Sequence, residues 1–407
     1  MFPPSVPVDE KHDADLVSAP AHDYIRSGHV LLSAREHPVR LVSRLWRYAD
    51  VFGLGSPEAG LHPRLVRRNL LALRAVIRIV LPTLPQRRRP RRLEHETLPE
   101  PGHLAIALRY GGYKVFDLDR EIVITRLPAS LAPDLVAAHI ARAEEAGRHG
   151  FAPTVVRADA TCGRYEETIV RGPHPPSIRS EPRRLSVAIL PLITSMCLAG
   201  GATRLVASDY ADVLDTLARR AIPHGDEPHL EGLDGRQLER ILQYVDHARS
   251  AIGSHEQTLL RTLSHGDMHG GNVIMSPSGP MLIDWDNLGY RSLLYDLWMV
   301  LFRAFRPAGA FRPPGWVDPD LSSVRRTMSE AVEDLQRHLE GGGFRPAHDL
   351  SAHHETYRAV FYLEFVVNRL EKLRWVLSLH GRAEVLDEIE DWITTFERFE
   401  RDMAACA

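Results

Sequence analysis

Residues 264–272, Ser-His-Gly-Asp-Met-His-Gly-Gly-Asn, and residues 283–286, Ile-Asp-Trp-Asp, are the part of the sequence that decides the fold. Between them, a Ser-Pro-Ser-Gly-Pro turn joins two short apolar segments, Val-Ile-Met and Met-Leu-Ile. Two apolar segments around a turn of this composition indicate a β-hairpin. Such a hairpin places Asp267 and Asn272 on the loop before its first strand and Asp284 at the end of its second strand.

This grouping of residues suits phosphoryl transfer. A nucleoside triphosphate is held together with Mg²⁺, which prefers oxygen ligands in octahedral geometry, and Asn272 and Asp284 can supply such oxygens. The hydroxyl that accepts the phosphoryl group needs a carboxylate within hydrogen-bond reach, and Asp267 can orient that hydroxyl and take its proton. The glycines let the backbone approach a phosphate without a Cβ in the way.

The same residues closely resemble the catalytic core of the aminoglycoside phosphotransferase and choline kinase-like family. These are small-molecule kinases with a protein-kinase-like fold. The family's His-Gly-Asp, four further residues and Asn occur here at 265–272, and its Ile-Asp-Trp with a following acid occurs at 283–286. Its Tyr-Asp-Leu, which helps to hold the active-site region, occurs at 295–297. Three motifs in the family's order and spacing are a much stronger signal than one motif alone.

The resemblance implies an α+β, two-lobed fold with a small antiparallel-sheet N-lobe at 101–172 and a mainly helical C-lobe at 173–407 that carries the catalytic hairpin. Residues 1–100 lie outside the resemblance, and we predict an N-terminal helical extension there. The implied reaction is transfer of the γ-phosphoryl group of ATP or GTP, with Mg²⁺, to a hydroxyl of an aminoglycoside-, choline- or sugar-like acceptor. A nucleotide and a small hydroxylated substrate are therefore the expected partners.

Other interpretations of these residues remain open at this stage. His265, Asp267 and His269 could ligate a transition metal, since imidazole and carboxylate suit zinc or iron, but the kinase pattern explains all the spacings. His265 is then expected to brace the loop. Asp286 is either a further magnesium ligand or a loop-capping carboxylate, and Asp296 is expected to be structural. A non-catalytic kinase-like binding or scaffold protein, or a kinase acting on a lipid headgroup or a protein, is the alternative function.

Composition sets broad limits on the function. The chain has 407 residues, of which 44% are hydrophobic and 25% charged, and its net charge of -3 does not favour nucleic acid as a partner. Three widely spaced cysteines indicate a reducing, cytoplasmic location without a disulfide framework. The start of the chain does not have the pattern of a secretory signal, and the apolar run around 185–198 is too short to span a bilayer.

The N-terminal hundred residues carry no motif that we can interpret. Residues 1–25 are expected to be disordered or loosely attached, and helical periodicity runs over residues 30–52 and 63–81. The basic segment 64–92, which ends in an arginine cluster, could contact an anionic membrane surface or nucleic acid. We favour instead a helix packed on the kinase body, followed by a solvated linker.

From His103 onward the pattern predicts the strands of an N-lobe. The predicted strands are Leu104 to Leu108, Lys114 to Leu118, Glu121 to Leu127, Thr154 to Ala158 and Tyr165 to Val170. Gly111 and Gly112, between the first two strands, would form the loop that covers the phosphates. Val170, with the residues that follow it, resembles the family's hinge, where backbone groups meet the adenine.

The cation that contacts the nucleotide phosphates is assigned to Arg126. Family members carry this cation on the third strand, where this chain offers Arg126, whereas Lys114 lies on the second strand and is the weaker candidate. The helix predicted from Pro133 to His149 should supply a glutamate that pairs with the cation. Its acids, at 144 and 145, sit late in the helix, and His139 is nearer the usual place, so the sequence departs here from the family's ion pair.

The rest of the chain is predicted to be mostly helical. Glu355, Tyr362, Glu364 and Asn368 share roughly one helical face. They could line a pocket for a polar, cationic acceptor, or form a solvated or inter-helix polar face, which we favour. The helices are expected at 185–199, 211–220, 234–250, 293–305, 323–339, 352–379 and 383–403.

Overall fold

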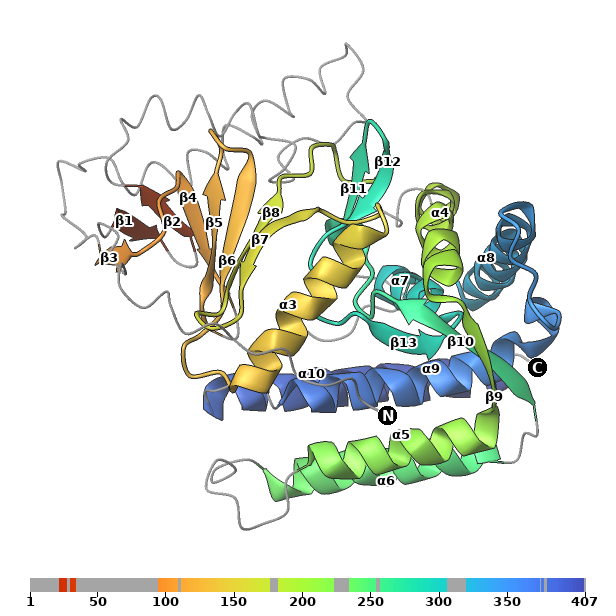
Figure 1. Cartoon of the computed structure of the whole chain (residues 1–407). Coiled ribbons are helices and arrows are strands. Elements are labelled where there is room, and N and C mark those ends of the chain that lie inside the picture. The colour runs from red at the N-terminus through yellow and green to blue at the C-terminus, as the bar shows by residue number, and fades with distance from the viewer. Residues whose placement is uncertain are drawn as a thin grey trace, which may run out of the picture.

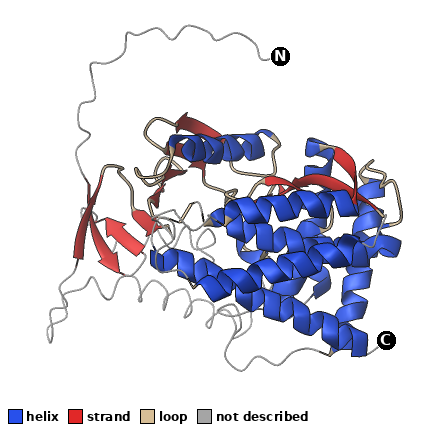
Figure 2. Cartoon of the chain, turned by 90° about the horizontal axis from the view of Figure 1, so that it is seen from below, coloured by secondary structure: helices blue, strands red, loops and turns tan. Residues whose placement is uncertain are grey.

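The chain is described here from a computed structural model. The structure describes residues 22–27, 30–33, 94–108, 111–175, 182–222, 234–253, 257–305, 320–373, 375–376 and 379–405. Strands gather in the first part of the described chain and helices in the second, and the two parts lie side by side in both views (Figures 1 and 2). The predicted fold class, α+β with an antiparallel sheet followed by a mainly helical part, is confirmed.

The first part is built on one eight-stranded antiparallel sheet with the strand order β3-β1-β2-β4-β5-β6-β8-β7. Short turns between consecutive strands give most of this order, because antiparallel neighbours can be joined by tight connections. Its strands are β1 (His22–Ser27), β2 (Val30–Ser33), β3 (Glu94–Leu98), β4 (Leu104–Ala107), β5 (Tyr113–Asp117), β6 (Ile122–Arg126), β7 (Val155–Asp159) and β8 (Arg164–Thr168).

Three of these strands come from the segment predicted to be a helical extension. β1 lies partly in the stretch expected to be disordered, and β2 occupies the start of the helix predicted from residue 30, so both predictions are wrong there. The apolar residues of β2 pair with β4, whose Leu104 and Ala105 are buried. The remainder of both predicted helices and the basic segment 64–92 lie outside the described residues.

The two faces of the sheet pack against different things. One face carries Val115 and Ile124, which form a small core with residues of β1, β2 and β3. The other face is covered by helix α3 (Pro133–Arg148), whose Val136 and Ile140 pack with Tyr165 of β8. Side chains alternate along a strand, so neighbouring residues of one strand belong to different environments.

The second part is a bundle organised around helix α9, which contacts α5, α6, α7, α8 and α10. Almost every residue of α9 from Thr356 to Leu370 is buried, as expected of a helix surrounded by other helices (Figure 1). The predicted helices of this part are confirmed, except that the helix predicted at 352–379 ends at Lys372 and Leu379 begins the next helix. Their bounds are α4 (Pro182–Gly200), α5 (Ala207–Ala221), α6 (Gly235–Gly253), α7 (Tyr295–Phe305), α8 (Leu321–Gly341), α9 (Leu350–Lys372) and α10 (Leu379–Ala405).

Two small sheets position the motif residues between the two parts. The predicted hairpin is confirmed as β11 (Val273–Ser276) paired with β12 (Gly279–Leu282). A three-stranded sheet, which we did not predict, has β10 (Thr258–Ser264) between β9 (Ala202–Val206) and β13 (Gly289–Ser292). β10 ends directly before His265, so this sheet fixes where the motif begins.

Among the described residues, no helix combines the length and the apolar character needed to cross a membrane.

Candidate active site

The loop that carries the His-Gly-Asp motif is anchored by one buried carboxylate. Asp296, at the start of α7, accepts hydrogen bonds from the backbone N–H of His265 (2.8 Å) and of Gly266 (3.0 Å). These are charge-assisted bonds to a side chain that is 3% exposed. The Tyr-Asp-Leu motif therefore fixes the backbone of the loop through Asp296. This contact agrees with the structural role predicted for Asp296.

Replacing Asp296 with alanine is expected to destabilise the fold by roughly 2–4 kcal/mol, because two buried N–H groups lose a charged acceptor. Urea denaturation would measure this as a lower midpoint at unchanged slope. Asp296→Asn keeps one acceptor oxygen and should lose less. Equal stability of Asp296→Ala and the wild type would contradict this anchoring role.

His265 braces the same loop against the hairpin. Its Nε2 lies 2.9 Å from the carbonyl oxygen of Ile283, and its Nδ1 lies 3.3 Å from the backbone nitrogen of Asp267, which donates to it. The ring meets Trp285 edge-on, with 4.7 Å between ring centroids. Gly266 has a φ of 80°, and a Cβ there would lie 2.5 Å from the carbonyl oxygen of Asn287. The glycine of the motif is thus required by close packing.

Three motif residues are held close together by backbone and side-chain bonds. The side-chain amide of Asn272 donates to the carbonyl oxygen of Asp267 (3.0 Å). The backbone N–H of Ile283 donates to the carbonyl oxygen of Asn272 (2.9 Å), which brings Asp284 to the same place. Asp284 has a φ of 69°, a left-handed conformation that is uncommon for a non-glycine residue and typical of functional sites.

Asn272 and Asp284 fit the requirements of a magnesium site. The side-chain nitrogen of Asn272 donates to the carbonyl oxygen of Asp267, so the side-chain oxygen of Asn272 is not used in this bond. Asp284 Oδ1 lies 3.1 Å from Lys114 Nζ, so a cationic group already lies against this carboxylate. A carboxylate and an amide oxygen form a hard donor set, and Mg²⁺ usually completes its shell with water and phosphate oxygens.

The transition-metal interpretation finds no support in the geometry. Over the described ranges, no group of three or more His, Cys, Asp or Glu side chains is arranged to hold a metal ion. His265 is engaged with Ile283, and His269 Nδ1 accepts from the backbone N–H of Gly271 (3.0 Å) at the start of the short 3-10 helix η3 (Gly270–Asn272). Both histidines thus serve the shape of the loop.

Lys114 of β5, rather than Arg126 of β6, is the sheet cation that reaches the motif residues. Burial alone would lower the pKa of Lys114, but Asp284 and other nearby acids outweigh burial and hold that pKa well above its usual value. The residue is therefore a lysine cation directed at the candidate metal ligand. From the sequence alone, Lys114 is the weaker candidate for the cation that contacts the phosphates.

Strand register explains why Arg126 lies elsewhere. Lys114 is directly opposite Thr125, and Thr125 is opposite Tyr165, so these three residues share the face covered by α3. Arg126 follows Thr125 and points to the other face, where its Nη1 lies 3.6 Å from the buried carboxylate of Glu100. A difference of one residue along a strand changes the face. The structure does not bring Arg126 to the motif residues.

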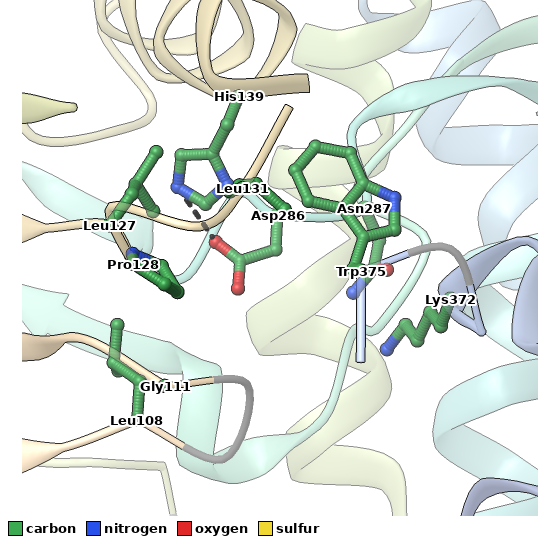
Figure 3. A pocket seen from close by; sticks show the side chains of 10 residues that line it. All are labelled: Leu108, Gly111, Leu127, Pro128, Leu131, His139, Asp286, Asn287, Lys372 and Trp375. Carbon is green, nitrogen blue, oxygen red and sulfur yellow. Dashed lines mark ion pairs between the residues drawn. The ribbon is translucent and has the colours of Figure 1, made fainter. Parts of the chain in front are cut away.

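Helix α3 contributes a histidine where a glutamate was expected. Nε2 of His139 lies 3.4 Å from Asp286 Oδ1, and the two side chains face each other in Figure 3. Arg142, one turn further along α3, donates to the carbonyl oxygen of Asp286 (2.9 Å). Glu145 instead pairs with His149 of its own helix. Asp286 therefore joins the motif region to α3, which is a different position from that of Asp284.

The predicted glycine loop and hinge are tight backbone contacts. Gly112 has a φ of 74°, and a Cβ there would lie 2.2 Å from the carbonyl oxygen of Arg126. Gly111 lines a small cavity together with Asp286, as Figure 3 shows. Val170 is buried, and the nearby Pro173 carbonyl accepts from the backbone N–H of Met275 (2.8 Å). The segment predicted to be the hinge is thus hydrogen-bonded directly to the hairpin.

Two arginines that sequence reasoning missed hold Asp267. Its Oδ1 lies 2.7 Å from Arg303 Nη2 of α7 and 2.9 Å from Arg369 Nη2 of α9. Burial would raise the pKa of the Asp267 carboxyl, but Arg369 and Arg303 outweigh it and hold this pKa well below its usual value. Both arginines lie on helices far along the chain and outside any motif, so the sequence carried no signal for them.

The four residues predicted to share one face of α9 divide between two cavities, and Glu364 and Asn368 line the same one. Glu364 is buried and accepts from the Tyr210 hydroxyl (2.6 Å) and from the Ser292 N–H (2.7 Å). Asn368 donates to the carbonyl oxygen of Gly266 (3.2 Å). Glu355 and Tyr362 instead line a cavity between α6, α9 and α10. The favoured interpretation, an inter-helix polar face, describes Glu364.

Comparison with known proteins supports the class of protein that this site suggests. The model of the phosphotransferase enzyme family matches residues 201–328, which include all three motifs. This match confirms the resemblance seen in the sequence. No curated protein sequence matches the chain.

Solved structures similar to this chain include small-molecule kinases. A choline/ethanolamine kinase family protein from Mesorhizobium loti has 14% identity and a TM-score of 0.40, covering 70% of this chain and 88% of its own. The choline kinase LicA from Streptococcus pneumoniae has 13% identity and a TM-score of 0.41, covering 72% and 89%. Aminoglycoside phosphotransferase APH(3'')-Id from Streptomyces rimosus has 17% identity and a TM-score of 0.38, covering 65% and 92%.

Proposed function

We propose that this chain is a kinase that transfers the γ-phosphoryl group of ATP, or of GTP, to a hydroxyl of a small molecule. The observation that carries the proposal is the convergence of Asp267, Asn272 and Asp284, with Lys114 directed at them from the sheet. Phosphoryl transfer needs little covalent chemistry from the protein, so positioned charges of this kind are what the reaction requires.

The residues would divide the reaction between them. Asp267 would orient the acceptor hydroxyl and take its proton as the hydroxyl oxygen bonds to the γ-phosphorus and the bond to the ADP oxygen breaks. Asn272 and Asp284 would hold Mg²⁺, which neutralises charge on the phosphate oxygens when it is bound. Lys114 would contact the phosphates in place of Arg126.

Other predicted features enter the proposal with the same status. Gly111 and Gly112 would cover the phosphates, and Val170 would lie at the adenine. Asp286 is assigned to positioning α3, because His139 and Arg142 both contact it. The lobe boundaries at residues 101 and 173, and a cytoplasmic location, remain predictions from the sequence.

The direct test is an ADP-release assay across hydroxylated metabolites and antibiotics, with product mass measured for each hit. An acceptor that gains one phosphate group supports the proposal. ADP release that never depends on an acceptor, in a panel covering sugars, amino alcohols, hydroxy acids and aminoglycosides, would count against it.

Exchanging Lys114 for methionine is expected to raise the KM for ATP by about 10- to 100-fold, the equivalent of one or two lost charge-assisted bonds. Arg126→Met is the matched control, since it removes a cation from the opposite face of the same sheet. It should leave the KM for ATP unchanged and lower the melting temperature, because buried Glu100 loses a partner. A raised KM for ATP in Arg126→Met, with an unchanged KM in Lys114→Met, would assign the phosphate contact to Arg126 instead.

One observation favours a second candidate, a non-catalytic binding protein. Both Arg303 and Arg369 lie on Asp267 Oδ1, so the candidate base is already engaged. The melting temperature measured with ATP separates the two candidates. An increase that requires Mg²⁺ supports the kinase, because Asn272 and Asp284 are proposed to bind ATP through Mg²⁺. An increase that is equal with and without Mg²⁺ would favour the binding protein.

A further inference from the structure

The surroundings of Asp267 are rich in cationic side chains. Arg303 and Arg369 contact its carboxylate, and Lys372 lies one turn beyond Arg369 on α9. Glu388 of α10 lies 3.1 Å from Arg369 Nε. Arg303, Arg369 and Lys372 thus lie close to the carboxylates of Asp267 and Glu388. Burial, and then Arg369, lower the pKa of Lys372 to about 8, so this lysine lies in a buried place beside another cation.

A cavity of about 290 Å³ opens next to this cluster. It is connected to the motif loop through Asn368, whose amide donates to the carbonyl oxygen of Gly266 (3.2 Å) and whose Oδ1 accepts from Arg291 Nη2 (3.0 Å). Four of the side chains that line the cavity are cationic, namely Arg142, Arg261, Arg291 and Lys372.

Three acids also line the cavity, one fewer than its cations. Glu364 accepts bonds from Tyr210 and Ser292, and burial raises its pKa. Asp286 lies 3.4 Å from His139 Nε2, but burial lowers the pKa of His139, so this imidazole leaves the charge of Asp286 in place. Glu371, the third acid, is exposed to solvent. Four cationic side chains and three acids thus line the cavity, so the wall carries a net positive charge.

The arginines of this wall are held in fixed orientations. Arg291 lies over the ring of Tyr295, with 5.1 Å from its guanidinium carbon to the ring centroid. Arg142 lies over the ring of Trp375 at 5.3 Å. Planar guanidinium groups that are fixed in this way bind carboxylates and phosphates with little further loss of entropy.

We propose that the acceptor is a hydroxylated small molecule that carries an anionic group, a carboxylate or a phosphate. The anion binds to the cationic wall formed by Arg142, Arg291 and Lys372, and the hydroxyl faces Asp267. This inference rests on the proposed kinase function. Amine-bearing acceptors, which are protonated at neutral pH, meet repulsion from the same wall, so charge selects against them.

The inference is tested by calorimetric titration of the full chain with matched compounds in the presence of Mg²⁺ and a non-hydrolysable ATP analogue. Galacturonate, galactose and galactosamine form the carboxylate arm, and glycerol phosphate and glycerol form the phosphate arm. We expect at least one anionic compound to bind about tenfold or more tightly than its neutral counterpart, and galactosamine to bind most weakly. Tighter binding of galactosamine, or no binding of either anion, overturns the inference.

Two variants test whether the anionic compounds bind to the cationic wall. Lys372→Gln should weaken anion binding by about tenfold, whereas Arg249→Gln, which changes an exposed arginine of α6, should leave it unchanged. Equal binding by Lys372→Gln and the wild type would also overturn the inference. Binding of the ATP analogue is measured in each sample. If the analogue itself does not bind with Mg²⁺, the kinase function fails, and if it binds but the anions do not, only the acceptor class fails.

Discussion

Asp267→Asn is expected to lower kcat for phosphoryl transfer by about 10²- to 10⁴-fold, the usual contribution of a positioned general base. The amide keeps the size of the side chain but cannot take the proton of the acceptor hydroxyl. The KM for ATP should change little, because nucleotide contacts are assigned to Lys114 and to the metal ligands. Steady-state kinetics on an accepted substrate measures both quantities.

The same variant should also be less stable than the wild type. Asp267 lies between Arg303 and Arg369, which are 13% and 3% exposed, and the amide removes its negative charge, so that Glu388 remains as the carboxylate paired with Arg369. Breaking a buried ion pair on one side typically costs about 3–5 kcal/mol. Kinetics must therefore be measured well below the melting temperature of the variant.

Asp246→Asn is a suitable control for this experiment. Asp246 lies on α6, is half exposed, and pairs with the surface residue Arg219. It should retain both activity and stability, since exposed ion pairs contribute little. If Asp267→Asn keeps full activity, Asp267 is not the base.

Asp284→Asn is expected to weaken ATP binding in the presence of Mg²⁺ by about 100-fold, and to change it little when Mg²⁺ is absent. The substitution removes a carboxylate ligand, and losses of about 10- to 100-fold are found even for groups that only support a ligand. The variant also removes the ion-pair partner of Lys114. Titration of ATP at several Mg²⁺ concentrations measures the two effects separately.

Asp212→Asn controls for the loss of one negative charge, because Asp212 is an exposed residue of α5 that pairs with Arg249. It should bind ATP and Mg²⁺ as the wild type does. A wild-type response of Asp284→Asn to Mg²⁺ would remove Asp284 from the metal site.

The hairpin and its motif residues could be predicted because their signal is local. A turn of Pro, Gly and Ser between two apolar segments fixes the hairpin, and its short length then brings Asn272 near Asp284. The helices of the second part were predictable for a similar reason, since each buries one periodic face. Long-range packing changes such elements little.

The choice between Lys114 and Arg126 could not be made in this way. Both lie on correctly predicted strands, but the face of each side chain depends on a register of one residue, which is set by pairing across the sheet. The arginine pair on Asp267 was harder still to predict. Residues 303 and 369 meet Asp267 only because α7 and α9 pack behind the loop, and no local pattern marks that contact.

The strands at residues 22–33 were missed because, although β1 and β2 pair with each other, the strands on their other sides are distant in sequence. β1 pairs with β3, about seventy residues further along the chain, and β2 pairs with β4. The apolar residues of 30–33 suit a helix as well as a strand when viewed alone. Pairing with β1 on one side and with β4 on the other decides between them.

The central claim is that the hairpin binds a nucleotide together with Mg²⁺. Calorimetric titration of the wild-type chain with ATP, once with Mg²⁺ and once with a chelator, tests it most directly. We predict saturable binding with Mg²⁺ and binding that is weaker by about tenfold or more with the chelator. Absence of binding in both titrations, or the same Kd in both, would contradict the claim.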